Sequence, residues 1–223
     1  MAPGNIILLN GAASAAKTKI IAVLQSVLNT PYLYTSFARF SSGIPNLDPS
    51  KRARWAKNQG QTFLAQPLKQ SSPLGGQLIT GMHQTIAVLA HTGHHVIVDH
   101  TLRDLRWLRE CAELFCELPT FFVGVLSSPI MLEPQAWESA NCTFDQVEAQ
   151  LTAVHIPGVY DLELDTALFS PLECAMQIKH RMQAGPPSVA MSWLKAWEDY
   201  TKPCGWLSPK APSNLQLTTG RWL

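Results

Sequence analysis

Residues 11–18 have the residue types and spacing of a phosphate-binding loop, with one departure. The Walker A pattern is Gly, four residues, then Gly-Lys-Ser/Thr between a strand and a helix. Lys17 and Thr18 occupy the positions of the lysine that contacts phosphate and the hydroxyl that contacts Mg²⁺. Ala16 replaces the second glycine, which normally allows backbone and phosphate to approach closely. The other candidate nucleotide contacts are Gly11, Ser14 and Ala15. The sequence therefore predicts ATP binding and also gives a reason for it to be weakened.

Asp99 is another candidate for a chemical role. It ends the apolar run Val-Ile-Val at 96–98. A strand that delivers a carboxylate beside a phosphate loop can hold or orient Mg²⁺. Apolar runs that end in aspartate are common, so a structural role at the strand end is the alternative. Because the run follows a Lys-Thr loop, we predict Thr18 and Asp99 as metal ligands.

Three residues close to Asp99 are further catalytic candidates. Arg103 and Arg106 could turn toward the phosphates and neutralise charge during phosphoryl transfer. His100 could act as a base beside Asp99. A surface or packing role is the alternative for each of the three.

Alternating strands and helices are needed to position these residues. Apolar runs and helical spacing predict strands at 6–10, 93–99, 119–126 and 159–165, and helices at 17–28, 76–92 and 104–117. Ser170 and Pro171 fit the N-cap and first position of a further helix. This order predicts an α/β fold with a doubly wound parallel sheet in three α/β/α layers. Ligands of such sheets bind at the carboxyl ends of the strands, where the loop and Asp99 would meet.

The composition favours one domain of ordinary size that stays in the cytoplasm. The chain has 223 residues, of which 46% are hydrophobic and 15% are charged, so a sizeable core is expected. No apolar run approaches the roughly 18 residues of a membrane span. The chain enters its first strand without a charged leader. The five cysteines form no CxxC pair, which is typical of free thiols in a reducing compartment.

Charge is distributed unevenly along the chain. Residues 1–109 contain eleven Lys/Arg and three Asp/Glu, whereas 110–178 contain eleven Asp/Glu and no Lys or Arg. A solvated acidic face is one interpretation and a partner surface is another. A short helix at 49–59 carries four basic residues, but the whole chain has a net charge of only +1. We therefore do not expect nucleic acid to be a partner.

The C-terminal region differs in composition from the rest. From residue 185 onward Pro, Ser and Trp are frequent, and a helix is expected near 192–200. We predict a domain at 1–184 and a C-terminal extension at 185–223. Four tryptophans of this extension could fold back on the domain or bind a protein partner: Trp193, Trp197, Trp206 and Trp222.

The chain resembles chloramphenicol phosphotransferase and related P-loop small-molecule kinases. The likeness covers about residues 5–182, and its most specific part is Tyr-Asp-x-Glu-x-Asp-Thr at 160–166. The other similar stretches are 6–11, 24–28, 93–99, 122–125, 154–155 and 171–175. The resemblance implies a P-loop kinase-like fold and transfer of the γ-phosphoryl group of ATP, with Mg²⁺, to a hydroxyl of a small substrate.

Three parts of the family pattern are missing from this chain. Ala16 is the first, in the phosphate loop. Ala38 stands where the family carries the aspartate expected to take the hydroxyl proton. The resemblance also implies a lid at about 128–150, where the arginines of the family align with Gln135, Trp137, Ser139 and Cys142. A positioned base is worth about 10²–10⁴-fold in rate, and one such arginine about 10³–10⁵-fold.

Two functions follow from this comparison with the family pattern. In the first, the protein is pseudokinase-like: it keeps the fold and weakened ATP binding, has impaired phosphoryl transfer, and serves in binding or regulation. In the second, it is an active ATP-dependent O-phosphotransferase on a small hydroxyl compound such as an antibiotic, with Arg103 or Arg106 as the replacement cation. The loss of cations favours the first, because electrostatic stabilisation is usually the largest catalytic contribution.

Overall fold

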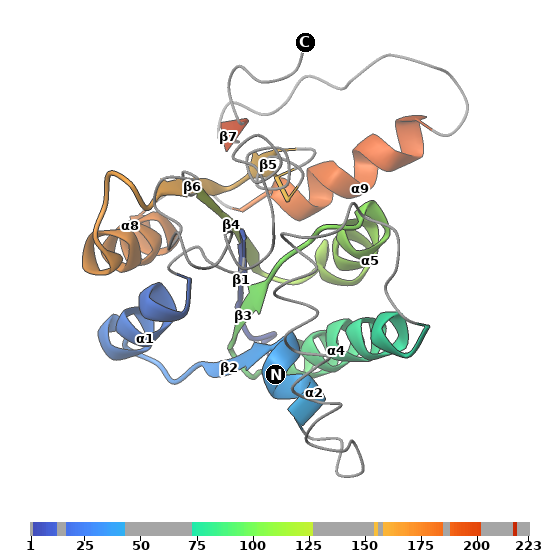
Figure 1. Cartoon of the computed structure of the whole chain (residues 1–223), viewed down its shortest axis with the longest axis horizontal. Coiled ribbons are helices and arrows are strands. Elements are labelled where there is room, and N and C mark those ends of the chain that lie inside the picture. The colour runs from blue at the N-terminus through green and yellow to red at the C-terminus, as the bar shows by residue number, and fades with distance from the viewer. Residues whose placement is uncertain are drawn as a thin grey trace, which may run out of the picture.

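A five-stranded parallel sheet forms the centre of the protein in a computed structural model (Figure 1). The structure describes residues 2–12, 17–42, 73–126, 154–155, 158–184, 188–201 and 216–217. The strand order is β2-β3-β1-β4-β6. The bounds are β1 Ile6–Asn10, β2 Leu33–Ser36, β3 Val96–His100, β4 Thr120–Leu126 and β6 Leu162–Asp165.

Helices cover both faces of this sheet. Figure 1 shows α1 and α8 on one side of the strands and α4, α5 and α9 on the other. The helices are α1 Lys17–Val27, α2 Phe37–Ser42, α4 Pro73–His91, α5 Leu105–Phe115, α8 Pro171–Ala184 and α9 Ala190–Thr201. The predicted doubly wound, three-layer α/β/α fold is confirmed.

The central strand β1 explains why the layers form. All five of its residues are buried, as expected for a strand with helices on both faces. Ile6 and Leu8 belong to the core under α4, α5 and α9, whereas Ile7 and Leu9 belong to the core under α1 and α8. Successive side chains point to opposite faces, so this one apolar run joins the two cores.

The boundaries of several elements differ from expectation. The helix expected from residue 76 begins at Pro73, which suits a first helical position because proline has no N–H to leave unbonded. The strand expected at 159–165 is divided at Asp161 into β5 Val159–Tyr160 and β6. At the start of α8, Ser170 and Glu173 form the predicted cap: Ser170 N–H donates to Glu173 Oε2 at 2.8 Å.

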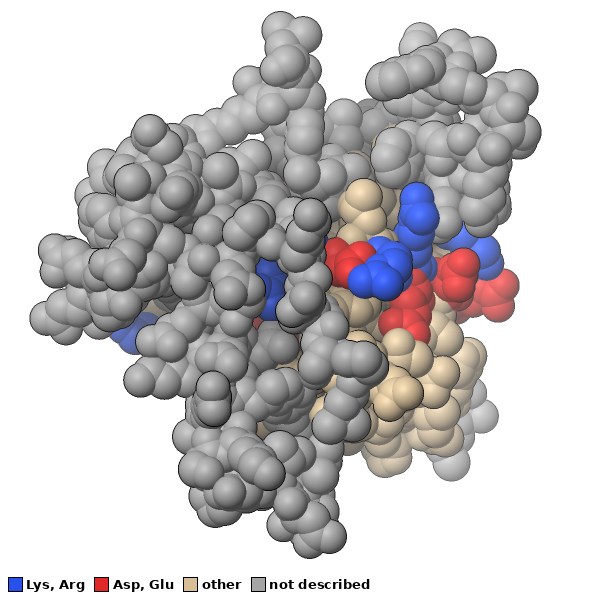
Figure 2. Space-filling view, turned by 45° about the vertical axis from the view of Figure 1, so that its right-hand side comes forward, with Lys and Arg blue, Asp and Glu red and all other residues tan. Residues whose placement is uncertain are grey.

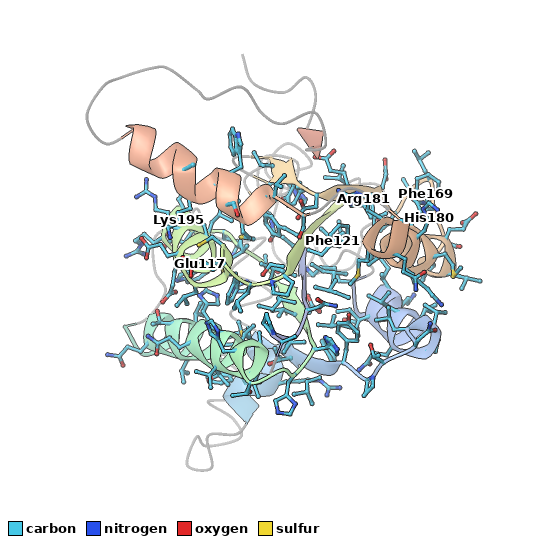
Figure 3. The ribbon with its side chains drawn as sticks, turned by 180° about the vertical axis from the view of Figure 1, so that it is seen from behind. Glu117, Phe121, Phe169, His180, Arg181 and Lys195 are labelled. Carbon is cyan, nitrogen blue, oxygen red and sulfur yellow. The ribbon has the colours of Figure 1, made fainter. Side chains whose placement is uncertain are left out.

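The first part of the C-terminal region packs on the domain. Ala190, Met191 and Leu194 of α9 belong to the core that β1 shares with α4 and α5. At the end of α5, Ser192 Oγ donates to the carbonyl oxygen of Cys116 at 3.1 Å. Figure 3 shows Lys195 on the same helix, and its Nζ lies 3.4 Å from Cys116 Sγ. The final described strand, β7 Gln216–Leu217, pairs antiparallel with β5.

Charge on the described surface is mixed. In Figure 2, which turns the α5 side toward the viewer, acidic and basic side chains lie interspersed rather than in an acidic field. The salt bridge between Arg106 and Asp104 at the start of α5 is one such pair. On the opposite side, the Arg181 guanidinium of α8 lies 5.4 Å from the ring centre of Phe121 on β4 (Figure 3).

Two features of the described residues bear on function. No described helix has the length and apolarity needed to cross a membrane. Within the same ranges, no three His, Cys, Asp or Glu residues are grouped in a way that could hold a metal ion. Cys111, Cys116 and Cys174 are free thiols, which agrees with the expectation from the cysteine pattern.

Candidate functional site

Lys17, Thr18 and Asp99 meet at the carboxyl edge of the sheet. The Lys17 ammonium lies 3.4 Å from Asp99 Oδ1, and Thr18 Oγ1 lies 3.5 Å from Asp99 Oδ2. The ammonium also donates to the carbonyl oxygen of Gly11 and, at 2.8 Å, to that of Ala12. Lys17 is only 2% exposed, whereas Thr18 is exposed. The three residues predicted to hold phosphate and Mg²⁺ are therefore neighbours in space.

The sheet register brings these residues together. β1 and β3 are adjacent and parallel, and Leu9 pairs with Asp99. Thr101, just beyond β3, donates through its hydroxyl to the carbonyl oxygen of Gly11 at 3.0 Å. The end of β3 is thus fastened to the start of the loop that leads into α1. Lys17 is the first residue of that helix, whose N-terminal N–H groups carry partial positive charge.

The electrostatics of the site favour an anion beside Lys17. Burial lowers the pKa of Lys17, and the nearby Asp99 carboxylate opposes this effect. A second anionic oxygen stabilises a buried ammonium whose only carboxylate partner is partly exposed. Asp99 Oδ2 and Thr18 Oγ1 are hard oxygen donors of the kind that Mg²⁺ prefers. This chemistry suits a phosphate with its magnesium ion.

His100 lies on the other side of β3 from Asp99. Consecutive strand residues point to opposite faces, and the His100 ring is buried between α4 and α5. Its Nδ1 accepts from the N–H of Thr101 at 2.8 Å, and its Nε2 lies 2.8 Å from His83 Nε2. Since His100 Nδ1 accepts, Nε2 carries the proton of the neutral ring. The structure thus gives His100 a packing role and does not bring it to Asp99 as a base.

A buried chain of hydrogen bonds continues from His100 to the surface. His83 Nε2 accepts from His100, so His83 Nδ1–H donates to Glu110 Oε2 at 2.7 Å. Burial lowers the pKa of both histidines, and the Glu110 carboxylate partly opposes this for His83. Thr80 Oγ1 donates to the same Glu110 oxygen at 3.3 Å. This chain fixes the orientation of His100, and through it the turn that carries Thr101.

The two candidate arginines lie in different surroundings. Arg106 is 79% exposed, and its guanidinium bonds the N-cap residue Asp104 at the start of α5. Arg103 is half-buried, and burial lowers its pKa. Arg103 follows the end of β3 by three residues, so its backbone lies at the carboxyl edge of the sheet. Its charge also contributes to the low pKa of His100.

Ala38 follows the strand that pairs with β3. It is the second residue of α2, it is exposed, and it follows β2 by two residues. Ser36, the last residue of β2, pairs with Asp99 in the sheet register. The guanidinium of the neighbouring Arg39 stacks over the Tyr34 ring at 4.2 Å. Position 38 thus follows the carboxyl end of β2, and its methyl group cannot take a proton.

Several predicted residues lie outside the described ranges. Among the nucleotide contacts these are Ser14, Ala15 and Ala16. The lid at about 128–150, with Gln135, Trp137, Ser139 and Cys142, and the basic helix at 49–59 also lie outside them. So do Trp206, Trp222 and the side chain of Trp197, whereas Trp193 is described and packs against the α5 core.

Sequence reasoning missed three residues that border the loop: Asn10, His155 and Tyr160. Asn10 is the last residue of β1, and its Nδ2 donates to the carbonyl oxygen of Val154 at 2.8 Å and to Tyr160 OH at 2.9 Å. Tyr160 OH in turn lies 2.7 Å from His155 Nδ1. The only available signal was that 154–155 and 160–166 belong to stretches similar to the family. Nothing in their spacing indicates that they contact residue 10.

Acid is expected to destabilise the protein in part through His155. Burial first, and then the charge of Lys17, lower the pKa of His155 from its ordinary value of 6.5 to about 4. Between these two values the unfolded chain binds a proton that the folded chain does not, so stability is lost as the pH falls from 6.5 toward 4. At pH 4.5 this single group costs about 2–3 kcal/mol.

The measurement is urea unfolding between pH 7 and 4.5 for the wild type and His155→Gln. The variant keeps a polar side chain but has no titrating group at this position. We expect the free energy of unfolding of the variant to fall less steeply with acid. Parallel curves for the two proteins would contradict the prediction, because His83 and His100 remain in both.

Comparisons with known proteins agree with this geometry. Residues 4–183 match the family described as chloramphenicol phosphotransferase-like protein. A putative O-phosphotransferase of Mycobacterium tuberculosis is 24% identical over 201 residues, covering 87% of this chain and 89% of that protein.

Solved structures share the fold. APS kinase of Mycobacterium tuberculosis has a TM-score of 0.52 and 13% identity, covering 82% of this chain and 100% of its own. The tunicamycin resistance protein of Deinococcus radiodurans has a TM-score of 0.53 and 14% identity, covering 82% and 99%.

Proposed function

The chain belongs to the chloramphenicol phosphotransferase-like family, and we propose that it is a nucleotide-binding member with much reduced phosphoryl transfer. In this role it binds ATP weakly and acts as a binding or regulatory protein. The observation that carries the proposal is the meeting of Lys17, Thr18 and Asp99 at the carboxyl edge of the sheet. The absence of a carboxylate at Ala38, two residues after the strand that pairs with β3, supports the loss of activity.

The described residues have the chemistry to hold Mg-ATP. The buried Lys17 ammonium would contact a phosphate oxygen, and Thr18 Oγ1 with Asp99 would hold Mg²⁺ directly or through water. Bound Mg²⁺ would supply charge neutralisation. Thr101 and the carbonyl oxygens of Gly11 and Ala12 hold the Lys17 side chain in place. These contacts favour binding and orientation, and none of them takes a proton from an acceptor hydroxyl.

An active O-phosphotransferase is the second candidate. The observation that favours it is Arg103, a half-buried residue that follows β3 at the carboxyl edge of the sheet. An arginine there could take over part of the charge neutralisation that the lid arginines provide in the family. The acceptor would be the hydroxyl of a small molecule such as an antibiotic, as the family name suggests.

Three accompanying features belong to the same proposal. We propose a phosphotransferase-like domain at 1–184 and an extension at 185–223. The tryptophans of the extension form the surface that binds a protein partner. Packing of Trp193 against the α5 core supports an attached rather than a detached extension. We also propose that the protein acts in the cytoplasm, where ATP is available.

Calorimetric titration with Mg-ATP tests the proposal. We expect the wild type to bind with a dissociation constant in the micromolar to high micromolar range, and Lys17→Ala to weaken binding at least about 30-fold, because a charge-assisted contact is worth roughly 2–3 kcal/mol. Lys19→Ala is the matched control, since Lys19 is an exposed lysine two residues along the same helix. Its affinity should stay within about 2-fold of wild type.

Two outcomes would contradict the proposal. If the wild type does not bind Mg-ATP up to millimolar concentration, the site is not a nucleotide site. If the wild type binds and also phosphorylates chloramphenicol or another hydroxyl compound at about 1–100 per second, it is an ordinary kinase and the second candidate is correct.

A further inference from the structure

Thr101 connects the end of β3 to the phosphate loop and to its lysine. The Thr101 hydroxyl donates to the carbonyl oxygen of Gly11 at 3.0 Å, and Lys17 Nζ lies 3.4 Å from the same hydroxyl oxygen. The Lys17 ammonium also donates to the Gly11 carbonyl oxygen. A hydroxyl can donate to one group and accept from another at the same time. The placement of Thr101 therefore affects where the Lys17 ammonium lies.

The backbone of Thr101 is held by His100, which lies on the other face of the sheet from Asp99. The N–H of Thr101 donates to His100 Nδ1 at 2.8 Å. A ring nitrogen accepts a hydrogen bond only when it carries no proton. The bond to Thr101 therefore requires one tautomer of the neutral His100 ring, with the proton on Nε2.

His83 and Glu110 supply the acceptors that this tautomer needs. His100 Nε2 lies 2.8 Å from His83 Nε2, and His83 Nδ1 lies 2.7 Å from Glu110 Oε2. An ionised carboxylate can only accept, so His83 carries its proton on Nδ1 and its Nε2 accepts from His100. The backbone N–H at one end of the chain and the carboxylate at the other end thus specify the same arrangement of protons.

Burial makes this arrangement costly to change. Both histidine rings are buried, with Phe115 edge-on to His83 and Trp107 near His100. A donor that loses its acceptor in such surroundings stays unsatisfied, because water does not replace the partner. Glu110, in contrast, is partly exposed on α5. The chain of hydrogen bonds therefore runs from the surface of the protein to the phosphate loop.

We propose that His100, His83 and Glu110 are positioning residues for the phosphate site and that they act through Thr101. The chain fixes the tautomer of His100, His100 holds the N–H of Thr101, and the Thr101 hydroxyl holds Lys17 where a phosphate oxygen would meet it. None of the three contacts the nucleotide. The inference rests on the proposed function, because it concerns the same lysine.

Calorimetric affinities for Mg-ATP test the role of Thr101. Thr101→Val removes the hydroxyl and keeps the shape of the side chain, so we expect binding to weaken roughly 3–10-fold. Thr101→Ser retains the hydroxyl and should bind within about 2-fold of the wild type. Thr85→Val is the matched control, since Thr85 is exposed on α4 and its hydroxyl donates to the carbonyl oxygen of Gly81 at 2.7 Å. This control should bind as the wild type does.

A double-mutant cycle at positions 83 and 100 tests whether His83 acts through the tautomer of His100. His83→Leu removes the acceptor of His100 Nε2–H and should weaken Mg-ATP binding roughly 3–10-fold. His100→Asn places an amide oxygen at the position of Nδ1, where it can accept from the Thr101 N–H without any tautomer. We expect His100→Asn to bind within about 2-fold of the wild type, and His83→Leu to cause no further loss in that background. Urea unfolding of each variant measures its stability separately.

Nuclear magnetic resonance of the wild type gives a readout that requires no substitution. The ¹⁵N signals of a neutral imidazole distinguish the nitrogen that carries the proton from the one that does not. Near neutral pH we expect the proton on Nε2 in His100 and on Nδ1 in His83, with and without Mg-ATP. A proton on His100 Nδ1 would overturn the inference, because that nitrogen could not accept from Thr101.

Two affinity results would also overturn the inference. One is that Thr101→Val binds Mg-ATP as the wild type does. The other is that His83→Leu weakens binding equally in the wild-type and His100→Asn backgrounds, which would mean that His83 acts only through stability. In both cases the proposed nucleotide site survives. Failure of the wild type to bind Mg-ATP is a different result: it removes the proposed function, whereas the tautomers of His83 and His100 can still be measured.

Discussion

The combined variant Ala16→Gly/Ala38→Asp/Gln135→Arg is expected to raise ATP turnover by at least about 10³-fold. Each change restores one part of the family pattern that the chain lacks. A positioned general base alone is worth about 10²–10⁴-fold, and one arginine at the transferring phosphoryl group about 10³–10⁵-fold. The estimate is set well below their product, because residues that act on one transition state are not additive. Release of ADP is the measurement, with chloramphenicol present and absent as the acceptor probe.

The structure supports the Ala38→Asp substitution in this variant. Ala38 is exposed at the start of α2, so a carboxylate there needs no rearrangement of the core. Ser36 pairs with Asp99 in the sheet register, and position 38 follows two residues later, at the start of α2. An aspartate at 38 is expected to take the proton of an acceptor hydroxyl. Its own cost in stability should be small, since exposed positions usually tolerate substitution within about 0.5 kcal/mol.

The single variants and a matched control decide how the result is interpreted. Ala22→Asp makes the same chemical change at an exposed position of α1 and should leave turnover at the wild-type level. Each single variant should give only a small part of the gain, because two essential groups are still missing. If the combined variant binds ATP but turns it over no faster than the wild type, the site differs from the family pattern in more than the three missing groups. Our explanation of the reduced activity would then be wrong.

The core of the site could be predicted because it depends on local patterns. A buried strand, a Lys-Thr pair and a following helix define the loop geometry within about twenty residues. The apolar run that ends at Asp99 is a second strand of the same parallel sheet, and such strands end at one edge. These two facts are sufficient to bring Lys17 to within 3.4 Å of Asp99.

The alternation of side chains along a strand could have excluded His100 from the predicted site. Side chains alternate along a strand, so adjacent residues cannot both face the nucleotide site. Since Asp99 was assigned to the site, His100 had to point to the α4 and α5 side. Its partner His83, however, lies 17 residues away on helix α4, whereas His100 lies on strand β3, and no local pattern indicates that pair.

Asn10, His155 and Tyr160 could not have been connected from spacing. Asn10 and Tyr160 are 150 positions apart, and their contact depends on how β5 and β6 pack beside β4. Gly124 of β4 illustrates this dependence, because a Cβ there would come within 2.6 Å of the Tyr160 ring. Close packing of the ring over β4 directs its hydroxyl group to the end of β1. Only the assembled sheet contains this information.

The Tyr-Asp-x-Glu-x-Asp-Thr stretch at 160–166 lies within the part of the chain that matches the family, and in this structure most of its described contacts hold the fold together. Tyr160 OH bonds Asn10, and Thr166 Oγ1 donates to the carbonyl oxygen of Leu126 at 3.0 Å. Asp165 Oδ1 accepts from the N–H of Ala167 at 2.8 Å. Asp161 is the most deeply buried acid of the stretch, at 1% exposure. A motif can thus identify a family through residues that stabilise the sheet beside the site.

Asp161→Ala is expected to lower the free energy of unfolding by about 3–5 kcal/mol, because the carboxylate accepts from three N–H groups, two of them buried and one partly buried. Its Oδ2 accepts from the N–H of Phe122 at 2.9 Å, and its Oδ1 accepts from those of Val189 and Ala190 at 2.8 and 3.2 Å. These bonds join β4 to the start of α9 across the point where β5 ends. Burial raises the pKa of Asp161, and the same three bonds oppose that change.

Urea unfolding of three variants separates the buried hydrogen bonds from other effects. Asp161→Asn keeps one acceptor oxygen and places an NH₂ group against the remaining N–H groups, so it should lose about half as much stability as Asp161→Ala. Asp165→Asn is the matched control, since its single N–H partner lies at an exposed turn where water can replace the bond. It should cost under about 1 kcal/mol. Equal losses at 161 and 165 would mean that the link from β4 to α9 does not contribute to stability. Since a domain of this size has only about 5–15 kcal/mol to lose, the expected loss at Asp161 is large enough to explain why a family marker need not contact a substrate.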